Sequence, residues 1–203
     1  MLKTREEIIN KFLNKKNTFL SPLHIQTRRL ELNPLQLKDA GILFTYRSLP
    51  EVYKYQQWAP QRLEEVQDFI RRYSISAEVK PGNWKQLGIF LKENQKLIGD
   101  CGFCPQQDQV EIGYTISPKY QGKGYGKEAV TALINFLFQT YPIGRIIART
   151  DPQNLASITL LGCVNFIQTG FFPRSIKIRG RWRDDVLFIL TRRDWLTIKR
   201  TNP

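Results

Sequence analysis

Three glycines alternate with bulkier residues in the stretch SPKYQGKGYGKEAV, at positions 122, 124 and 126. Glycine loses more backbone freedom on folding than any other residue, so glycines in this pattern need a structural reason. A strand-like segment, VEIGYTI, precedes them, and a strongly periodic helix, KEAVTALINFLFQTY, follows. Amide groups in such a turn can point into one concavity, where the helix dipole favours negative charge. The stretch therefore predicts a phosphate-binding turn.

The turn does not match the two common nucleotide-binding patterns. A P-loop requires G-x-x-x-x-G-K-[ST], but Gln121 occupies the first glycine position and Glu128 follows Lys127. A dinucleotide-binding turn requires G-x-G-x-x-G, and here the third glycine comes one residue early. The turn taken alone leaves open a phosphate site or a purely structural turn.

The pattern around the turn is that of an α/β protein. Strands are expected at 28–35, 88–92, 96–104, 110–116, 144–150, 169–178 and 181–193, and helices at 37–48, 63–78, 127–141 and 151–166. A strand, a helix and a second strand in this order predict a parallel pair of neighbouring strands. Asn165 is expected to adopt the left-handed conformation that ends the last of these helices. We predict a lead-in helix within residues 1–20 and a single domain over residues 21–203.

Cysteine and histidine usage excludes several kinds of site. Cys101, Cys104 and Cys163 are an odd number in a chain of this size, which argues against a disulfide framework. A metal site needs about four ligands, and the only histidine is His24, so we expect no metal and no histidine-based catalysis. No apolar run approaches the roughly 20 residues that span a bilayer. We expect a cytoplasmic protein without a membrane segment.

The positive charge is concentrated near the C-terminus. The chain has a net charge of +13. Nine basic residues but only three aspartates lie between Phe171 and Arg200. This asymmetry favours an anionic partner, such as an acidic protein, a nucleic acid or a phosphorylated small molecule. A solvated basic surface that aids solubility is the alternative.

Two further segments that follow the glycine turn along the chain make its pattern specific to one protein family. EIGYTISPKYQGKGYGKEAVTALINFLF, RIIARTDPQNLASITLLGCVNF and GRWRDDVLFIL together resemble the GNAT N-acetyltransferases, in the Rim-type branch that acetylates ribosomal-protein N-termini. The resemblance covers about residues 26–195. It implies a mixed central sheet of about seven strands, with a splayed parallel pair and helices on both faces. It also implies acetyl-CoA as the acetyl donor.

The resemblance assigns donor-binding residues by motif. The family pattern Q/R-x-x-G-x-G/A implies that backbone amides of the turn hold the pyrophosphate, over Gln121, Gly122, Lys123, Gly124, Tyr125 and Gly126, with Lys127 adding charge. The preceding strand implies backbone contacts from Tyr114, Thr115 and Ile116 to the pantetheine arm and the thioester. The family pattern N-x-x-S falls on Asn154 and Ser157. Asn154 would contact the pantetheine arm, cap its helix, or do both.

Acetyl transfer to an amine needs a base, a donor for the oxyanion and a hydrogen bond or proton for the leaving thiolate. Glu111 is the candidate base, directly or through water, and a structural carboxylate is the alternative. Many GNAT enzymes use a tyrosine of the second helix as the acid, but that position is Leu161 here. Ser157 is the expected substitute.

The acceptor pocket is expected to form from Tyr53–Arg62 and the strands around Arg181–Asp185. The basic excess disfavours polyamine and aminoglycoside acceptors, and fits an acidic protein N-terminus or another small amine acceptor. The alternative is a GNAT-fold module that binds acyl-CoA or nucleic acid without catalysis. The chain is expected to be a monomer or a homodimer.

Overall fold

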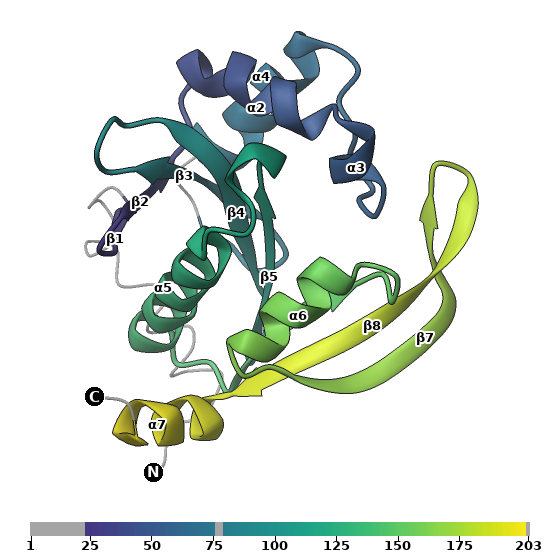
Figure 1. The fold of residues 1–203 in the computed structure, drawn as a ribbon. Coiled ribbons are helices and arrows are strands. Elements are labelled where there is room, and N and C mark those ends of the chain that lie inside the picture. The colour runs from purple at the N-terminus through teal and green to yellow at the C-terminus, as the bar shows by residue number, and fades with distance from the viewer. Residues whose placement is uncertain (1–22, 76–78, 202–203) are drawn as a thin grey trace.

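A computed structural model describes residues 23–75 and 79–201. They form one eight-stranded sheet of order β1-β2-β3-β4-β5-β6-β8-β7 (Figure 1). The strands are β1 Ile25–Gln26, β2 Leu30–Pro34, β3 Lys85–Leu91, β4 Leu97–Pro105, β5 Gln109–Ile116, β6 Arg145–Thr150, β7 Ile167–Ile178 and β8 Arg181–Thr191. The expected sheet is thus confirmed, with two-residue β1 as the additional strand. The helix predicted within residues 1–20 lies outside the described residues, so that helix and the domain bounds stay predictions.

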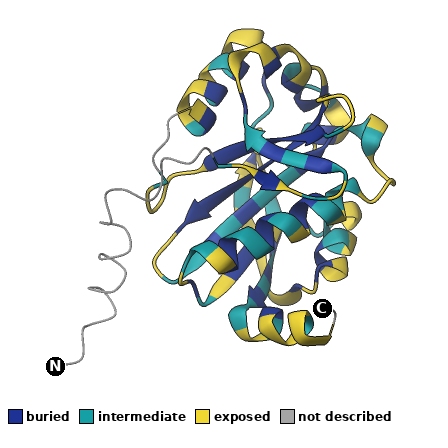
Figure 2. Cartoon of the chain, turned by 90° about the vertical axis from the view of Figure 1, so that its left-hand side faces the viewer, coloured by how far each residue is buried: buried dark blue, intermediate teal, exposed yellow. Residues whose placement is uncertain are grey.

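Helices cover both faces of the sheet, and their bounds are α2 Ala40–Arg47, α3 Pro50–Tyr53, α4 Leu63–Ile70, α5 Tyr125–Thr140, α6 Leu155–Cys163 and α7 Arg192–Thr201. In the larger hydrophobic core, α5, α6 and α7 pack against buried strand residues on one face of the sheet. A smaller core packs α2 and α4 on the other face, beside β3 and β4. Buried residues accordingly follow the strands, while the outer helix faces are exposed (Figure 2). No helix in the described ranges is long and apolar enough to cross a bilayer.

The C-terminal helix α7 was not predicted, because residues 181–193 read as one strand. The strand ends at Thr191 and α7 begins at the next residue. The Thr191 hydroxyl donates to Asp194 Oδ2 at 2.5 Å, and the Asp194 amide donates back to Thr191 Oγ1 at 3.2 Å. The hydrogen bond from the Asp194 amide makes Thr191 the N-cap of α7, and the T-x-x-D pattern is a signal that the sequence does contain. Trp195 then packs on Phe138 of α5, with ring centroids 5.1 Å apart.

The parallel pair β5 and β6 separates soon after it forms. The two strands pair only at Gln109, Val110 and Glu111, opposite Arg145, Ile146 and Ile147. Beyond Glu111, β5 remains paired with β4, and β6 remains paired with β8. The splayed pair expected from the family resemblance is therefore present. It leaves two facing strand edges without a partner strand, in the middle of the sheet.

A buried carboxylate joins α2 to the sheet on the face opposite α5. Asp100 of β4 has no exposed surface. Its Oδ1 accepts hydrogen bonds from Tyr46 Oη at 2.7 Å and Arg47 Nε at 3.0 Å, and its Oδ2 accepts from Arg47 Nη2 and Gln86 Nε2. Burial, followed by the Asp100 charge, raises the pKa of Tyr46 well above its usual value, so the phenol keeps its proton and donates it. Four donors thus compensate for the lost hydration of this carboxylate.

Replacement of Asp100 by alanine is expected to lower the free energy of unfolding by about 3–5 kcal/mol, because it leaves the Arg47 guanidinium buried without its counter-ion. Urea unfolding at neutral pH measures the loss. Asp68→Ala is the matched control, since the Asp68 side chain is 75% exposed in its ion pair with Arg71. We expect the control to cost less than about 1 kcal/mol. Equal losses for the two variants would contradict the central role of Asp100.

Candidate active site

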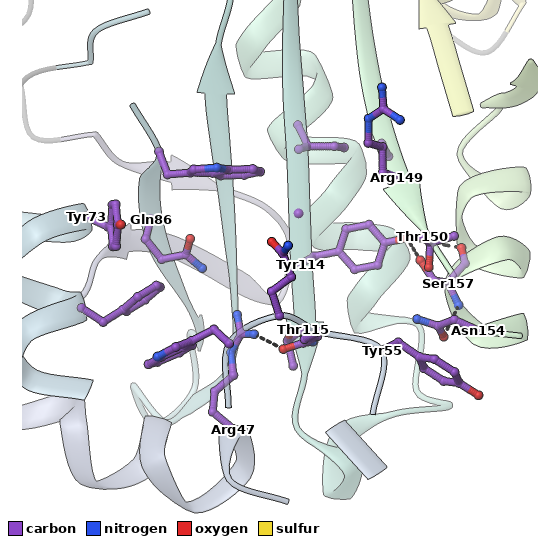
Figure 3. A pocket seen from close by; sticks show the side chains of 18 of the residues that line it. Arg47, Tyr55, Tyr73, Gln86, Tyr114, Thr115, Arg149, Thr150, Asn154 and Ser157 are labelled. Carbon is purple, nitrogen blue, oxygen red and sulfur yellow. Dashed lines mark hydrogen bonds between the residues drawn. The ribbon is translucent and has the colours of Figure 1, made fainter. Parts of the chain in front are cut away.

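A cavity of about 700 Å³ occupies the place where β5 and β6 separate. Its floor comes from Ile112–Thr115 of β5 and Ala148–Thr150 of β6. One side is closed by the start of α6, and the opposite wall comes from α2, α4, the segment after α3 and the start of β3 (Figure 3). The lining residues outside the floor are Arg47, Tyr55, Gln56, Gln57, Trp58, Glu65, Asp68, Phe69, Arg72, Tyr73, Trp84, Gln86, Asn154 and Ser157.

The glycine turn lies between β5 and α5, and none of its residues 121–127 lines this cavity. Gly122 and Gly124 have φ angles of 73° and 77°, which residues with a side chain rarely adopt. Gly124 is the N-cap of α5. The first hydrogen bond of the helix runs from the Glu128 amide to the Gly124 carbonyl, at 3.1 Å. The helix therefore supplies no acceptor for the amides of Tyr125–Lys127. These amides and the helix dipole make the turn suited to an anion.

The side chains of the turn do not all point to one place. Gln121 Nε2 donates to the Ile116 carbonyl at 2.9 Å, so these two predicted donor-binding residues are bonded to each other. Lys123 lies over the Tyr120 ring, at 5.6 Å from its centroid. Lys127 borders a second cavity of about 680 Å³, between α5 and β1. Gly124 borders the same second cavity as Lys127.

Asn154 and Ser157 begin α6 at the side of the main cavity. Asn154 Oδ1 accepts a hydrogen bond from the Ser157 amide at 3.3 Å, so Asn154 is the helix cap that was one of its two expected roles. Ser157 Oγ lies 3.0 Å from the hydroxyl of Tyr114 on β5 (Figure 3). Burial raises the pKa of Tyr114 to about 12 against the opposing effect of the Ser157 hydrogen bond. The sequence predicted only backbone contacts for Tyr114, because its reach to α6 depends on the packing of the two elements.

Glu111 lies where the two strands part, opposite Ile147, and next to the lining residue Ile112. It is half-buried and is not itself a lining residue of the cavity. Burial raises the pKa of Glu111; the Arg149 charge opposes this shift and the Asp185 charge adds to it. Arg149 and Asp185 form an ion pair at 3.5 Å. Glu111 is therefore a carboxyl whose proton is held more tightly than usual, on β5 just before the lining residues Ile112–Thr115.

The expected acceptor segment does border the cavity. Tyr55, Gln56 and Trp58 of the segment Tyr53–Arg62 line it. Gln56 joins two elements, because its Oε1 accepts from Arg47 Nη1 and its Nε2 donates to Thr115 Oγ1 at 2.9 Å. The segment Arg181–Asp185 contributes no lining residue. Its Arg183 instead pairs with Asp151 at 2.6 Å.

The β7–β8 hairpin is attached to the acceptor segment through its far end. In Figure 1 this hairpin forms an arm that runs past α6 towards α3. Arg179, at the turn of the hairpin, donates to the carbonyls of Tyr53, Lys54 and Gln56 at 3.0–3.2 Å. Sequence reasoning missed Arg179 because its partners lie more than 120 residues away.

Metal-ligating side chains do not gather in the part of the chain that the structure describes. Among those residues, no group of three or more His, Cys, Asp or Glu could hold a metal ion. Cys101 and Cys104 are buried in β4, and neither is in a disulfide.

Comparison with known proteins decides what kind of site this is. The family described as the acetyltransferase (GNAT) domain matches residues 29–166. The chain belongs to the GNAT acetyltransferase family. An uncharacterised N-acetyltransferase of Bacillus licheniformis, p20, is 34% identical over 84% of this chain and 97% of its own length. The [ribosomal protein uS5]-alanine N-acetyltransferase of Escherichia coli is 36% identical over 57% of this chain and 62% of its own length.

Solved structures share the GNAT fold. A GNAT-family acetyltransferase from Bacillus anthracis superposes with a TM-score of 0.75 at 24% identity, over 83% of this chain and 98% of that one. The predicted GNAT family is confirmed. The protein is an N-acetyltransferase that uses acetyl-CoA as its donor. The glycine turn fits that donor. Its backbone amides have no acceptor within the helix, and such amides are suited to bind a pyrophosphate.

The raised pKa of Glu111 predicts a pH-dependent difference in stability between the wild type and Glu111→Gln. A carboxyl with a folded-state pKa above its usual 4.5 favours the folded state at low pH, and this contribution is lost as the pH rises through the folded-state value. We therefore expect the wild type to lose stability relative to Glu111→Gln between acidic and neutral pH. Urea unfolding at a series of pH values measures the difference.

Glu64→Gln, on the exposed side of α4, is the matched control for the loss of one negative charge. A difference between the wild type and Glu111→Gln that grows in favour of the wild type as pH rises would contradict the raised pKa.

Proposed function

We propose that the protein acetylates the primary amine of a polypeptide N-terminus by direct attack in a ternary complex. The observation that carries the proposal is the single cavity that passes through the parted strands. It is bordered by the predicted donor residues Asn154 and Ser157 on one side and by the expected acceptor segment on the other. One continuous cavity allows donor and acceptor to be bound at the same time, as direct transfer requires.

The acceptor class is supported by two relatives. Beside the Escherichia coli enzyme, the uS5-alanine N-acetyltransferase of Shigella flexneri is also 36% identical to this chain, over 57% of it. An acceptor that is a ribosomal protein would place the enzyme in the cytoplasm, which is the location that we propose.

For donor binding, we assign the pyrophosphate to the backbone amides of Gln121–Lys127. The pantetheine arm is assigned to Asn154 and to the backbone of Tyr114–Ile116, at the edge of β5 that has no partner strand. The donor supplies an activated acetyl group on sulfur. The Ile116 carbonyl already accepts from Gln121, which leaves its second lone pair for such a contact.

For catalysis, Glu111 is the proposed base and Ser157 the proposed proton donor. Glu111 accepts the proton of the acceptor ammonium through water, since it lies on β5 outside the cavity lining. Its raised pKa brings it nearer to neutral pH, where a general base is most effective. As the new N–C bond forms and the C–S bond breaks, Ser157 Oγ donates a hydrogen bond to the leaving sulfur. The hydroxyl of Tyr114, 3.0 Å away, fixes the orientation of Ser157.

An acidic stretch following the N-terminus is the proposed partner of the β7–β8 arm. Three basic residues of the arm, Arg174, Lys177 and Arg181, form no ion pair with a described residue and are exposed. Arg179 and Arg183 are already bonded within the chain, so they are less suited to this role. The acidic residues would lie outside the cavity, several residues from the amine.

The catalytic roles predict unequal losses in Glu111→Gln and Ser157→Ala. Loss of a general base is expected to lower kcat/KM by about 10²–10⁴-fold. Loss of one hydrogen bond to the leaving group, worth about 1 kcal/mol, is expected to lower it about fivefold. Thiol release from acetyl-CoA with a peptide acceptor measures both, and the KM for acetyl-CoA should stay unchanged in Glu111→Gln.

The pH profile separates a base from a structural carboxylate. The wild-type rate should decrease at pH values below the raised pKa of Glu111. Glu111→Gln should show no such decrease at low pH. Glu64→Gln serves again as control. Full activity in Glu111→Gln would remove Glu111 from the mechanism.

The role of the arm predicts a charge-dependent effect of Arg181→Glu. Two peptides that share their first residue are compared, one with acidic and one with neutral residues at positions 3–5. Because single exposed ion pairs contribute about 0–1 kcal/mol, reversal should raise the KM of the acidic peptide by about fivefold and leave the neutral one unchanged. Arg193→Glu, on α7, is the control with an exposed arginine elsewhere. Equal effects on both peptides would refute the contact.

A further inference from the structure

The wall of the cavity that faces the parted strands is largely aromatic. Trp58 and Phe69 stack with ring centroids 4.2 Å apart at an interplanar angle of 11°, and Tyr73 lies 5.2 Å from Phe69. Trp84 adds a fourth ring from the residue that precedes β3. All four rings line the cavity, and Figure 3 shows Tyr73 on the side opposite to Asn154 and Ser157. A group that enters from this side therefore meets ring faces and edges first.

Trp84, like Tyr73, contributes to neither hydrophobic core. It is 36% exposed, whereas Trp58 and Phe69 pack against the smaller core. Its ring lies over Gly113 of the cavity floor: a Cβ on Gly113 would lie 3.7 Å from two of its carbons. Gly113 stands between Glu111 and Thr115 on the same face of β5. Trp84 is thus placed beside the point where the strands part, and its ring is not needed to fill the interior.

The charges of the cavity lining are largely compensated within the chain. Four of the five charged lining residues take part in ion pairs, which are Arg47–Asp100, Arg149–Asp185, Glu65–Arg62 and Asp68–Arg71. The fifth, Arg72, is exposed and lies 5.9 Å from the centroid of the Tyr73 ring. Little unpaired charge is left to attract an acidic or a second cationic group, and transfer of such a group to an aromatic wall is unfavourable.

We propose that this aromatic wall is the subsite for the group next to the acceptor amine, and that the group is uncharged and apolar, preferably aromatic. The proposal rests on the proposed function, and it names Trp84 as the residue that selects the group. The amine lies near Gly113, within reach of Glu111 through water, while the adjoining side chain packs on Trp84. Acidic residues further along the acceptor lie outside this subsite, against the β7–β8 arm.

The test is a panel of short peptides that differ only in their first residue. Peptides Xaa-Gly-Gly-amide with Phe, Leu, Ala, Asp or Lys first, together with spermidine, are assayed for thiol release at saturating acetyl-CoA. Since apolar contacts of this size discriminate by about 10–200-fold, we expect kcat/KM for Phe and Leu to exceed that for Asp, Lys and spermidine at least tenfold. A preference for Asp, Lys or spermidine would overturn the inference.

Variants of Trp84 show whether this residue carries the preference. Trp84→Ala should lower kcat/KM for the Phe peptide about tenfold, mainly through KM, and should leave the Ala peptide within about twofold. Trp84→Phe should retain most of the wild-type kcat/KM for the Phe peptide, because it keeps an aromatic ring. Leu196→Ala is the control, since Leu196 is an exposed apolar residue on α7, outside the cavity lining and off the β7–β8 arm. An unchanged KM for acetyl-CoA shows that each variant is folded.

Two results contradict different parts of the argument. Equal losses in Trp84→Ala for all peptides, or none for the Phe peptide, would overturn the role of Trp84 while transfer to amines stands. Binding of acetyl-CoA without transfer to any amine of the panel would overturn the proposed function, and this inference with it.

Discussion

Backbone pairing between β5 and β6 stops after Glu111 and Ile147, and the site depends on that interruption. Each strand is held on its outer side by an antiparallel partner, so the sheet stays intact while its middle opens. The parallel pairing itself requires a crossover connection, and that connection is α5. The first turn of α5, whose amides have no acceptor within the helix, therefore follows the strand that opens. One topology thus produces both the unpaired strand edges and this helix start.

The opposite wall depends on a different interaction, the burial of Asp100. Its four hydrogen bonds hold Tyr46 and Arg47 of α2 and Gln86 of β3 on one face of the sheet. Arg47 in turn bonds Gln56, which bonds Thr115 on the cavity floor. Arg47 also lies 5.5 Å from the centroid of the Trp58 ring. Gln56 and Trp58 of the segment Tyr53–Arg62 are thus linked to one carboxylate that does not line the cavity.

The sequence was most informative where neighbouring residues determine the structure. The glycines at 122 and 124, the strand before them and α5 after them were predicted because the signal lies within about thirty residues. Asn165, with a φ of 66°, adopts the left-handed conformation expected of it. Asp100, Gln56 and Arg179 were missed, since each is an ordinary polar residue until distant segments approach it. The helix α7 is a different case, because its Thr191–Asp194 capping pattern was present and was read as strand.

The two sides of the cavity are encoded in separate stretches of the chain. The turn, the floor strand and the start of α6 lie between residues 109 and 157, whereas the aromatic wall lies between residues 58 and 84. Only a few side-chain bonds, such as Gln56 to Thr115, connect them. Mutations can therefore accumulate in the earlier stretch without disturbing the later one. A gene with this arrangement can diverge after duplication into copies that keep one half of the cavity and alter the other.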